Sequence, residues 1–485
     1  MGTTTKRHKL VAEQLERPCE DRISNLPSSL IGYILSFLPT KDAVATSVLS
    51  SRWKDFWPLV TRLSIDDYLL RSPESKNSFE RLRFEFVDFV HRVLLTGSVS
   101  GIETFRFQCS QRYDASSVRA WLSSALKGNN VREVDVIVDA WDFSVLPSSL
   151  FTCRTLVKLN LGKVFMNVPD SVWLPCLKHV ELHGVEFPND DSISRLLSGC
   201  PVLGSLCLKR CMGRNVRVIN ISVPTLTHLI LEFLHHYSLY IISKHLPKFH
   251  IVLNTPSLLH ISIEDSIHES YVFEKPHQLA GACFILYSPL GPNLLPVFPF
   301  EGPKLSSASP FEDVHHIAIH DLLKGSSKVK SLHFVTKGFN RCELMPKYEN
   351  LTELVFGTHW NVTLDLLHTF LERSPKLSRL ALTFNHKDDE TLNFSKTGDD
   401  DGGGGSLEWD HPSRRVPDCL LFHLKIVEIW NFRGLKKEIE LVKYLLRNGR
   451  ALEKVTVERA PIRGETSKDV WAWQRKGPGL GVVRE

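Results

Sequence analysis

Residues 21–57 read DRISNLPSSLIGYILSFLPTKDAVATSVLSSRWKDFW, and this stretch decides how the rest of the chain is organised. Apolar residues recur in it at helical spacing, which predicts three short helices in succession. The apolar stripes are Leu30, Ile31, Ile34, Leu35 and Leu38 in the first helix, Val44, Ala45, Val48 and Leu49 in the second, and Trp53, Phe56, Trp57 and Val60 in the third.

The ends of these helices have recognisable signals. Leu26-Pro27 leads into the first helix, whose first turn Ser28 or Ser29 can cap, and Pro39 ends it. A second helix can be capped by Thr40. Three helices of this length bury little apolar surface alone, so the excess must face the rest of the chain or a partner.

The stretch resembles an F-box, the module that docks a substrate receptor on the SKP-type adaptor of an SCF (cullin–RING) ubiquitin ligase. The resemblance rests on Leu26-Pro27, Leu30, Ile34-Leu35, Leu38-Pro39, Asp42, Val48 and Arg52-Trp53, in order and at the family's spacing. It implies that the adaptor binds Leu26, Pro27, Leu30, Ile34, Leu35, Leu38, Pro39, Val48 and Trp53. The alternative is a helical cap on the following part of the chain, which predicts that Leu26, Leu30, Leu35, Leu38, Val48 and Trp53 pack onto residues 79–95 and the first strands.

Composition narrows the class of protein. Of 485 residues, 42% are hydrophobic and 23% charged, and the net charge is +5, which is too small to indicate nucleic-acid binding. We find no apolar run of the roughly 18 residues that a membrane span needs, and no signal peptide. The ten cysteines show no C-x-x-C pair, so we expect no zinc site and reduced thiols in the cytoplasm, the nucleus or both.

A repeated pattern begins near residue 102. An apolar residue is followed three and five positions later by two more, and neighbouring copies mostly start about 21 to 32 residues apart, the period of leucine-rich repeats. The copies start at Ile102, Val131, Leu156, Leu177, Leu203, Leu226, Leu258, Val329, Leu351, Leu377, Leu424 and Leu452.

The last two apolar residues of each copy point to the same side of a short strand, and helices such as residues 192–197 and 364–371 separate the strands. Stacked units of this kind bury a continuous apolar face, which predicts a curved α/β solenoid with a parallel sheet. An ordinary buried α/β sheet is the alternative. Residues 63–67 read as a short strand and residues 79–95 as an amphipathic helix.

The repeats also resemble those of plant F-box leucine-rich-repeat proteins. The segment LLSGCPVL at residues 196–203 carries this resemblance, and it implies that Cys200 and Cys211 are packing and turn residues and not nucleophiles. Residues 264–325 interrupt the rhythm, with a Pro- and Gly-rich loop or irregular repeat. The low-complexity residues 388–406 are predicted to form a flexible linker.

After the linker, strand, helix and strand patterns follow at residues 424–429, 438–448 and 452–457. They resemble the FBD domain that ends many plant F-box leucine-rich-repeat proteins, on the residues Trp409, Val416-Pro417, Cys419-Leu420, Leu424-Lys425, Gly434, Glu438, Tyr444-Leu445 and Leu452-Glu453-Lys454. The polar end of the chain does not fit this resemblance.

The sequence therefore predicts an α/β fold with an N-terminal three-helix F-box, a leucine-rich-repeat solenoid and an FBD-like α/β unit. The predicted parts are a disordered tail at 1–20, the F-box at 21–60, the solenoid at 61–387, the linker at 388–406, the FBD-like domain at 407–460 and a disordered tail at 461–485.

No catalytic motif is present, and we expect no cofactor. His316 and His320 form an i, i+4 pair, but residues 314–319 alternate like a strand, so we do not expect a metal site there. The predicted function is that of the substrate-recognition subunit of an SCF-type ligase, which binds an SKP-type adaptor, through it a cullin, and an unknown target protein. A small-molecule co-ligand is a variant of this hypothesis. A repeat scaffold without ubiquitin transfer is the alternative.

Overall fold

The computed structural model describes a defined part of the chain. The described residues are 23, 25–67, 79–95, 99, 101–110, 113–128, 130–140, 146–211, 213, 215–233, 250–265, 270–274, 278–287, 310–337, 342–358, 364–384, 415–460, 470–475 and 480–484. The predicted tail at 1–20, the predicted linker at 388–406 and Trp409 lie outside them. None of the helices among these residues combines the length and apolar character that a membrane span requires.

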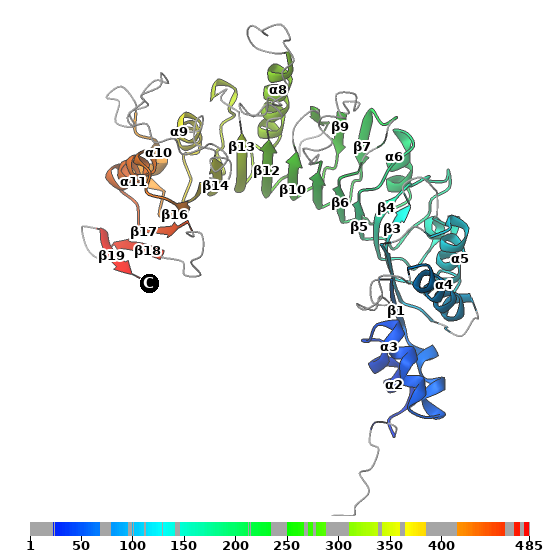
Figure 1. The fold of residues 1–485 in the computed structure, drawn as a ribbon. Coiled ribbons are helices and arrows are strands. Elements are labelled where there is room, and N and C mark those ends of the chain that lie inside the picture. The colour runs from blue at the N-terminus through cyan, green and yellow to red at the C-terminus, as the bar shows by residue number, and fades with distance from the viewer. Residues whose placement is uncertain are drawn as a thin grey trace, which may run out of the picture. The chain divides into compact units, whose positions relative to one another are not determined.

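The chain divides into two compact units, Met1–Val164 and Phe165–Glu485. In Figure 1 the first unit runs from blue to cyan, and the second from there to red.

The first unit begins with short helices. The helix α2 spans Ser28–Leu35 and α3 spans Thr40–Ala45, as the sequence predicted. The third predicted helix is instead a series of 3₁₀ turns, because Pro58 cannot donate an α-helical hydrogen bond in that region. These turns are η2 (Arg52–Asp55) and η3 (Trp57–Leu59), whereas the 3₁₀ turn η1 (Thr46–Val48) continues the second predicted helix beyond the end of α3.

The predicted caps of these helices are wrong. Pro27 and Pro39 occupy the N-cap positions, and no side chain caps either helix. Thr40 is buried, and its Oγ1 accepts a hydrogen bond from the Ser64 N–H at 2.8 Å, which ties α3 to the first strand.

A parallel sheet with the order β1-β2-β3-β4 completes the first unit. The helix predicted at residues 79–95 is confirmed as α4, and the strand predicted near residue 63 as β1. The remaining elements follow the repeat pattern. The bounds are β1 Arg62–Asp66, α4 Phe79–Leu95, β2 Thr104–Cys109, α5 Ala115–Ala125, β3 Glu133–Ala140, η4 Ser148–Thr152 and β4 Lys158–Val164.

The sheet of the second unit has one parallel strand for each repeat. Its parallel strands are β5 His179–His183, β6 Ser205–Lys209, β8 His228–Glu232, β10 His260–Asp265, β12 Gly281–Tyr287, β13 Ser331–Lys337, β14 Glu353–Thr358, β15 Arg379–Phe384, β16 Ile426–Phe432 and β17 Lys454–Arg459.

Two predictions about this sheet are wrong. The rhythm continues past residue 264, because β12 pairs in parallel with both β10 and β13. Its copy of the pattern is Leu279, Ala282 and Phe284, in which alanine replaces a large residue. The Pro- and Gly-rich loop was predicted mainly at residues 288–309, which lie outside the described residues. The end of the chain is not wholly a disordered tail, because β18 (Val470–Arg475) and β19 (Leu480–Arg484) add to β17 in antiparallel pairs.

Helices and a small second sheet lie on one side of this sheet, and Figure 1 shows α6, α8 and α9 there. The predicted strand at 314–319 is wrong, since those residues lie inside α8; the helices predicted at 192–197, 364–371 and 438–448 are confirmed. The elements are α6 Asp191–Ser198, α8 Pro310–Gly325, η6 Cys342–Leu344, α9 Leu364–Arg373, α10 Asp418–Phe422, α11 Lys436–Asn448, and the parallel strands β7 Val218–Ser222, β9 His250–Asn254 and β11 Ser270–Phe273.

The repeat pattern forms the core. In every predicted copy the three apolar side chains are buried, and none is more than 7% exposed. The register aligns the second apolar position from strand to strand, as in Leu206, Leu229 and Ile261. Burying one such side chain contributes roughly 1.5–3 kcal/mol, so the aligned core stabilises the stack, while the residues between the apolar positions face the opposite side of the sheet.

Candidate functional site

The outer side of the F-box helices exposes large apolar side chains. Leu30 and Ile34 lie one turn apart on α2, and Val48 lies at the end of η1. The exposed members and their exposed fractions are Leu30 48%, Tyr33 60%, Ile34 47%, Phe37 63%, Leu38 38%, Val48 86% and Leu49 65%. We call these seven residues the F-box patch. So many large apolar side chains exposed within twenty residues indicate a surface that a partner covers.

Some of the residues predicted to bind an adaptor belong to this patch, and others lie outside it. Leu30, Ile34, Leu38 and Val48 belong to the patch. Of the others, Pro27 is exposed, Leu26, Pro39 and Trp53 are half-buried, and Leu35 is buried at 2% exposed. Leu35 therefore packs inside the F-box and can act on a partner only by holding α2 in place.

Sequence reasoning missed Tyr33, Phe37 and Leu49. Tyr33 and Phe37 form an edge-to-face pair with ring centroids 5.0 Å apart, and the Arg62 guanidinium lies 5.8 Å from the Phe37 centroid. The i, i+4 spacing of the two aromatic residues was the available signal, since such pairs share one face of a helix. It was overlooked because both fall outside the stripe that begins at Leu30.

The patch stands on a closely packed support. A Cβ added at Gly32 would lie 2.8 Å from the Leu59 Cβ, so the missing side chain allows α2 to contact η3. The Ser36 Oγ donates to the Gly32 carbonyl at 2.8 Å and accepts from the Thr61 N–H at 3.0 Å. These contacts fix α2 against the start of β1.

The inner side of the F-box faces α4. Phe56 is buried, and Val44 and Trp57 line a cavity of about 370 Å³ with α4 residues that include Phe89 and Val93. The alternative cap hypothesis assigned the contact with α4 and the first strands to Leu26, Leu30, Leu35, Leu38, Val48 and Trp53. The structure gives it to Val44 and Trp57, and leaves the patch exposed.

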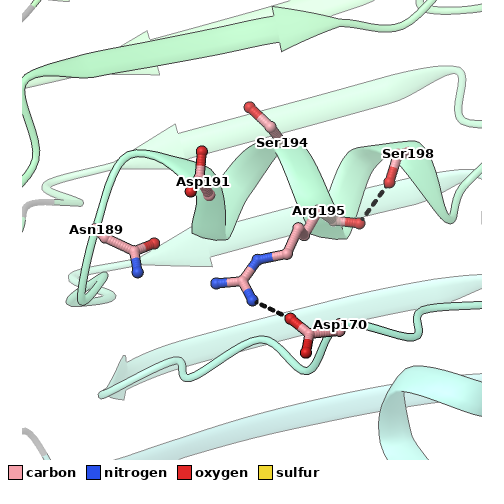
Figure 2. A pocket seen from close by; sticks show the side chains of 6 residues that line it. All are labelled: Asp170, Asn189, Asp191, Ser194, Arg195 and Ser198. Carbon is pink, nitrogen blue, oxygen red and sulfur yellow. Dashed lines mark hydrogen bonds and ion pairs between the residues drawn. The ribbon is translucent and has the colours of Figure 1, made fainter.

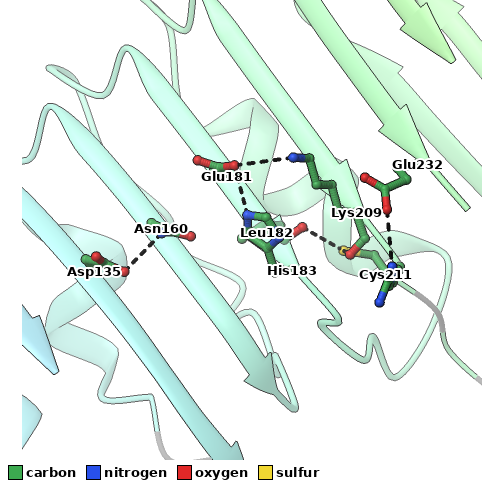
Figure 3. Close-up of polar contacts among 9 residues, drawn as sticks. Asp135, Asn160, Glu181, Leu182, His183, Lys209, Cys211 and Glu232 are labelled. Carbon is green, nitrogen blue, oxygen red and sulfur yellow. Dashed lines mark hydrogen bonds and ion pairs between the residues drawn. The ribbon is translucent and has the colours of Figure 1, made fainter. Parts of the chain in front are cut away.

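A second surface with recognition chemistry is the sheet face that the described helices leave uncovered. In the first unit, Asp135 accepts from Arg106 at 2.8 Å and from the Asn160 amide at 3.0 Å. In the second unit, Glu181 contacts His183 at 2.8 Å and the Lys209 Nζ at 4.0 Å. Figure 3 shows the Asp135–Asn160 contact and the contacts of Glu181 with His183 and Lys209.

The thiols of Cys200 and Cys211 are structural and buried. The Cys211 Sγ donates to the Leu182 carbonyl at 3.3 Å, and the Cys200 Sγ donates to the Leu196 carbonyl at 3.1 Å. Burial raises the pKa of each thiol to about 12. Both are therefore protonated at neutral pH, and the prediction that they are packing residues is confirmed.

A polar pocket of about 520 Å³ lies beside α6, lined by Asp170, Asn189, Asp191, Ser194, Arg195 and Ser198. The Arg195 Nη1 donates to the Asp170 Oδ1 at 2.7 Å (Figure 2). The Ser198 and Ser194 hydroxyls donate to the carbonyls of Arg195 and Asn220. No base activates either serine in this arrangement. Across the described ranges, His, Cys, Asp and Glu side chains nowhere gather in threes as a metal ion would require.

Comparison with known proteins identifies the family to which this chain belongs. The F-box domain family model matches residues 23–63, the model for the LRR repeats of FBD-associated F-box protein At5g56370 matches residues 118–272, and the FBD model matches residues 411–457. The FBD-associated F-box protein At4g10400 of Arabidopsis thaliana is 31% identical over 444 residues, which cover 90% of this chain and 92% of that protein. The chain belongs to the FBD-associated F-box protein family.

Another relative supports the same architecture. The F-box/FBD/LRR-repeat protein At4g00160 of Arabidopsis thaliana is 30% identical over 454 residues, covering 92% of this chain and 88% of that protein. As an FBD-associated F-box protein, this chain carries its F-box on α2, α3 and the 3₁₀ turns, and its FBD segment on α10, β16, α11 and β17. F-box proteins generally bind an SKP-type adaptor and through it a cullin.

Proposed function

We propose that this protein is the substrate-recognition subunit of an SCF-type ubiquitin ligase. In this proposal the F-box patch binds the SKP-type adaptor, and the repeats bind a target protein. The observation that carries the proposal is the patch itself, in which seven large apolar side chains stay exposed on a module whose family binds adaptors.

The protein then acts without chemistry of its own. It holds the target near a ubiquitin-charged enzyme elsewhere in the complex, which raises the effective concentration of a target lysine. We further propose that it acts in the cytoplasm or nucleus, where the nine described cysteines, all free thiols, would stay reduced.

The test is co-purification of the full chain with an SKP-type adaptor. Val48→Asp is the best variant, because Val48 is 86% exposed and a charge there leaves the fold intact while it opposes an apolar interface. Phe84→Asp is the matched control, since Phe84 is 74% exposed on α4 outside the F-box.

We expect the wild type and the Phe84 variant to co-purify with the adaptor, and the Val48 variant to be lost. Failure of the folded wild type to bind would contradict the proposal. The chain would then be a repeat scaffold without ubiquitin transfer.

A further inference from the structure

Two carboxylates lie side by side on the uncovered face of the second unit. Glu232 ends β8 and pairs in register with Glu264 of β10. Neighbouring strands are about 4.8 Å apart, so the two side chains start one strand spacing from each other. Like charges at this separation repel, and a cation between them would remove the repulsion.

The nearby cations compensate these two negative charges only in part. The Arg210 Nε lies 3.5 Å from Glu232, and the Lys209 Nζ contacts Glu181. Within the described residues, no hydrogen bond or ion pair engages the Glu264 carboxylate. Burial, and after it the charge of Glu232, raises the pKa of Glu264. Lys209 and Arg210 lower this pKa to a smaller extent, so the nearby cations compensate the charge of Glu264 only in part.

The strands beyond Glu264 carry a neutral strip on the same face. In line with Glu264, β12, β13, β14 and β15 place Ile285, Val335, Gly357 and Thr383. One row away, in line with Ser262 of β10, lie Cys283, His333, Val355 and Ala381.

Neither titratable residue of the strip adds a charge at neutral pH. Burial lowers the pKa of His333 and raises that of Cys283. A Cβ at Gly357 would lie 2.7 Å from the Val335 Cγ2, so the valine covers the glycine and the strip is continuous.

This juxtaposition selects one kind of occupant. An acidic segment would be repelled by Glu232 and Glu264, whereas a basic side chain would neutralise their negative charge. Arginine fits best, because its planar guanidinium can engage two carboxylates at once. The neutral strip starts one strand farther on, and it accepts an apolar side chain from the same segment.

We propose that this face binds an extended segment of the target in which a basic residue, preferably arginine, pairs with Glu264 and Glu232, and an apolar residue about two to four positions away packs on the strip. The inference rests on the proposed function, since it names the chemistry of the target that the receptor recognises.

The test uses the full chain bound to its adaptor as bait for a phage library of random short peptides. We expect the enriched peptides to share an arginine or lysine within about four residues of a large apolar residue. Glu264→Gln should weaken binding of such a peptide about tenfold or more. Glu133→Gln is the control, because Glu133 is exposed on β3 in the first unit.

A charge exchange makes the test sharper. A peptide with its basic residue replaced by glutamate should lose binding to the wild type and regain it with Glu264→Arg. Enriched peptides without a basic residue, no enrichment, or equal binding by the Glu264→Gln variant would overturn the inference. Adaptor co-purification is measured separately, so it would still report on the proposed function.

Discussion

At the scale of single residues, Glu438 illustrates how one side chain can organise a turn. It is fully buried, and its Oε2 accepts hydrogen bonds from the N–H groups of Arg433, Gly434 and Leu435 at 2.9, 2.6 and 3.0 Å. These groups precede α11, where backbone donors have no helical partner. Gly434 makes the turn possible with a φ of 80°.

We predict that Glu438→Ala lowers the free energy of unfolding of the segment around α11 by about 1–3 kcal/mol, because it removes three hydrogen bonds that a buried carboxylate accepts. Thermal melting followed by circular dichroism measures the change. Glu440→Ala on the same helix is the control, with little effect expected. Equal melting of the two variants would show that the three hydrogen bonds add no stability.

For Glu264 we predict the opposite effect on stability from that of Glu438. Its pKa is raised in the folded protein by burial and by Glu232, and lowered to a smaller extent by Lys209 and Arg210. The folded state therefore binds the proton more tightly than the unfolded state, and its relative stability falls as the pH rises through the raised pKa.

Glu264→Gln should consequently keep or raise the melting temperature at neutral pH, and the difference from wild type should shrink in acid, where the wild-type carboxyl is protonated. A glutamate that served only the fold would show the reverse, with a lower melting temperature for the variant. A side chain that is retained against stability is expected where it binds something.

At the scale of elements, each strand separates core from surface by a single residue. Leu229 and Ile230 are neighbours on β8, with exposed fractions of 1% and 41%. We predict that Leu229→Ala lowers the free energy of unfolding by about 2–5 kcal/mol, because it leaves a cavity. Ile230→Ala should change it little, and chemical denaturation distinguishes the two. Similar losses for both would contradict the assigned register.

The sequence predicted most of these elements because the repeat pattern reports burial directly. It failed where one element lacked its usual signal. The strand β12 was not predicted because Gly281 and Ala282 are small. It nevertheless pairs with β10 in regular parallel register. The alternation at residues 314–319 suggested a strand, but these residues belong to the sixteen-residue helix α8.

The binding surface was predictable only in part. The ordered F-box residues located it, yet their spacing could not show that Leu35 is buried while Phe37 is exposed. That division depends on the contact of α2 with η3 at Gly32, which joins residues far apart in the sequence. The pairing of Glu232 with Glu264 likewise depends on sheet register and has no signal in either repeat alone.

At the scale of the whole molecule, the proposed docking and recognition surfaces belong to different units. The F-box patch lies within Met1–Val164, and the Glu232–Glu264 pair within Phe165–Glu485. A receptor needs this separation, since the adaptor and the target must be bound together. Variants of one surface are therefore expected to leave the other binding reaction unchanged.

The measurement that tests the central claim most directly is hydrogen exchange of the full chain with and without an SKP-type adaptor. We predict slower exchange of the backbone amides in α2, α3 and η1, where the F-box patch lies, and unchanged exchange in β8 to β15. Unchanged exchange at residues 28–48, or protection of the sheet alone, would contradict the claim that the F-box patch is the adaptor-binding surface.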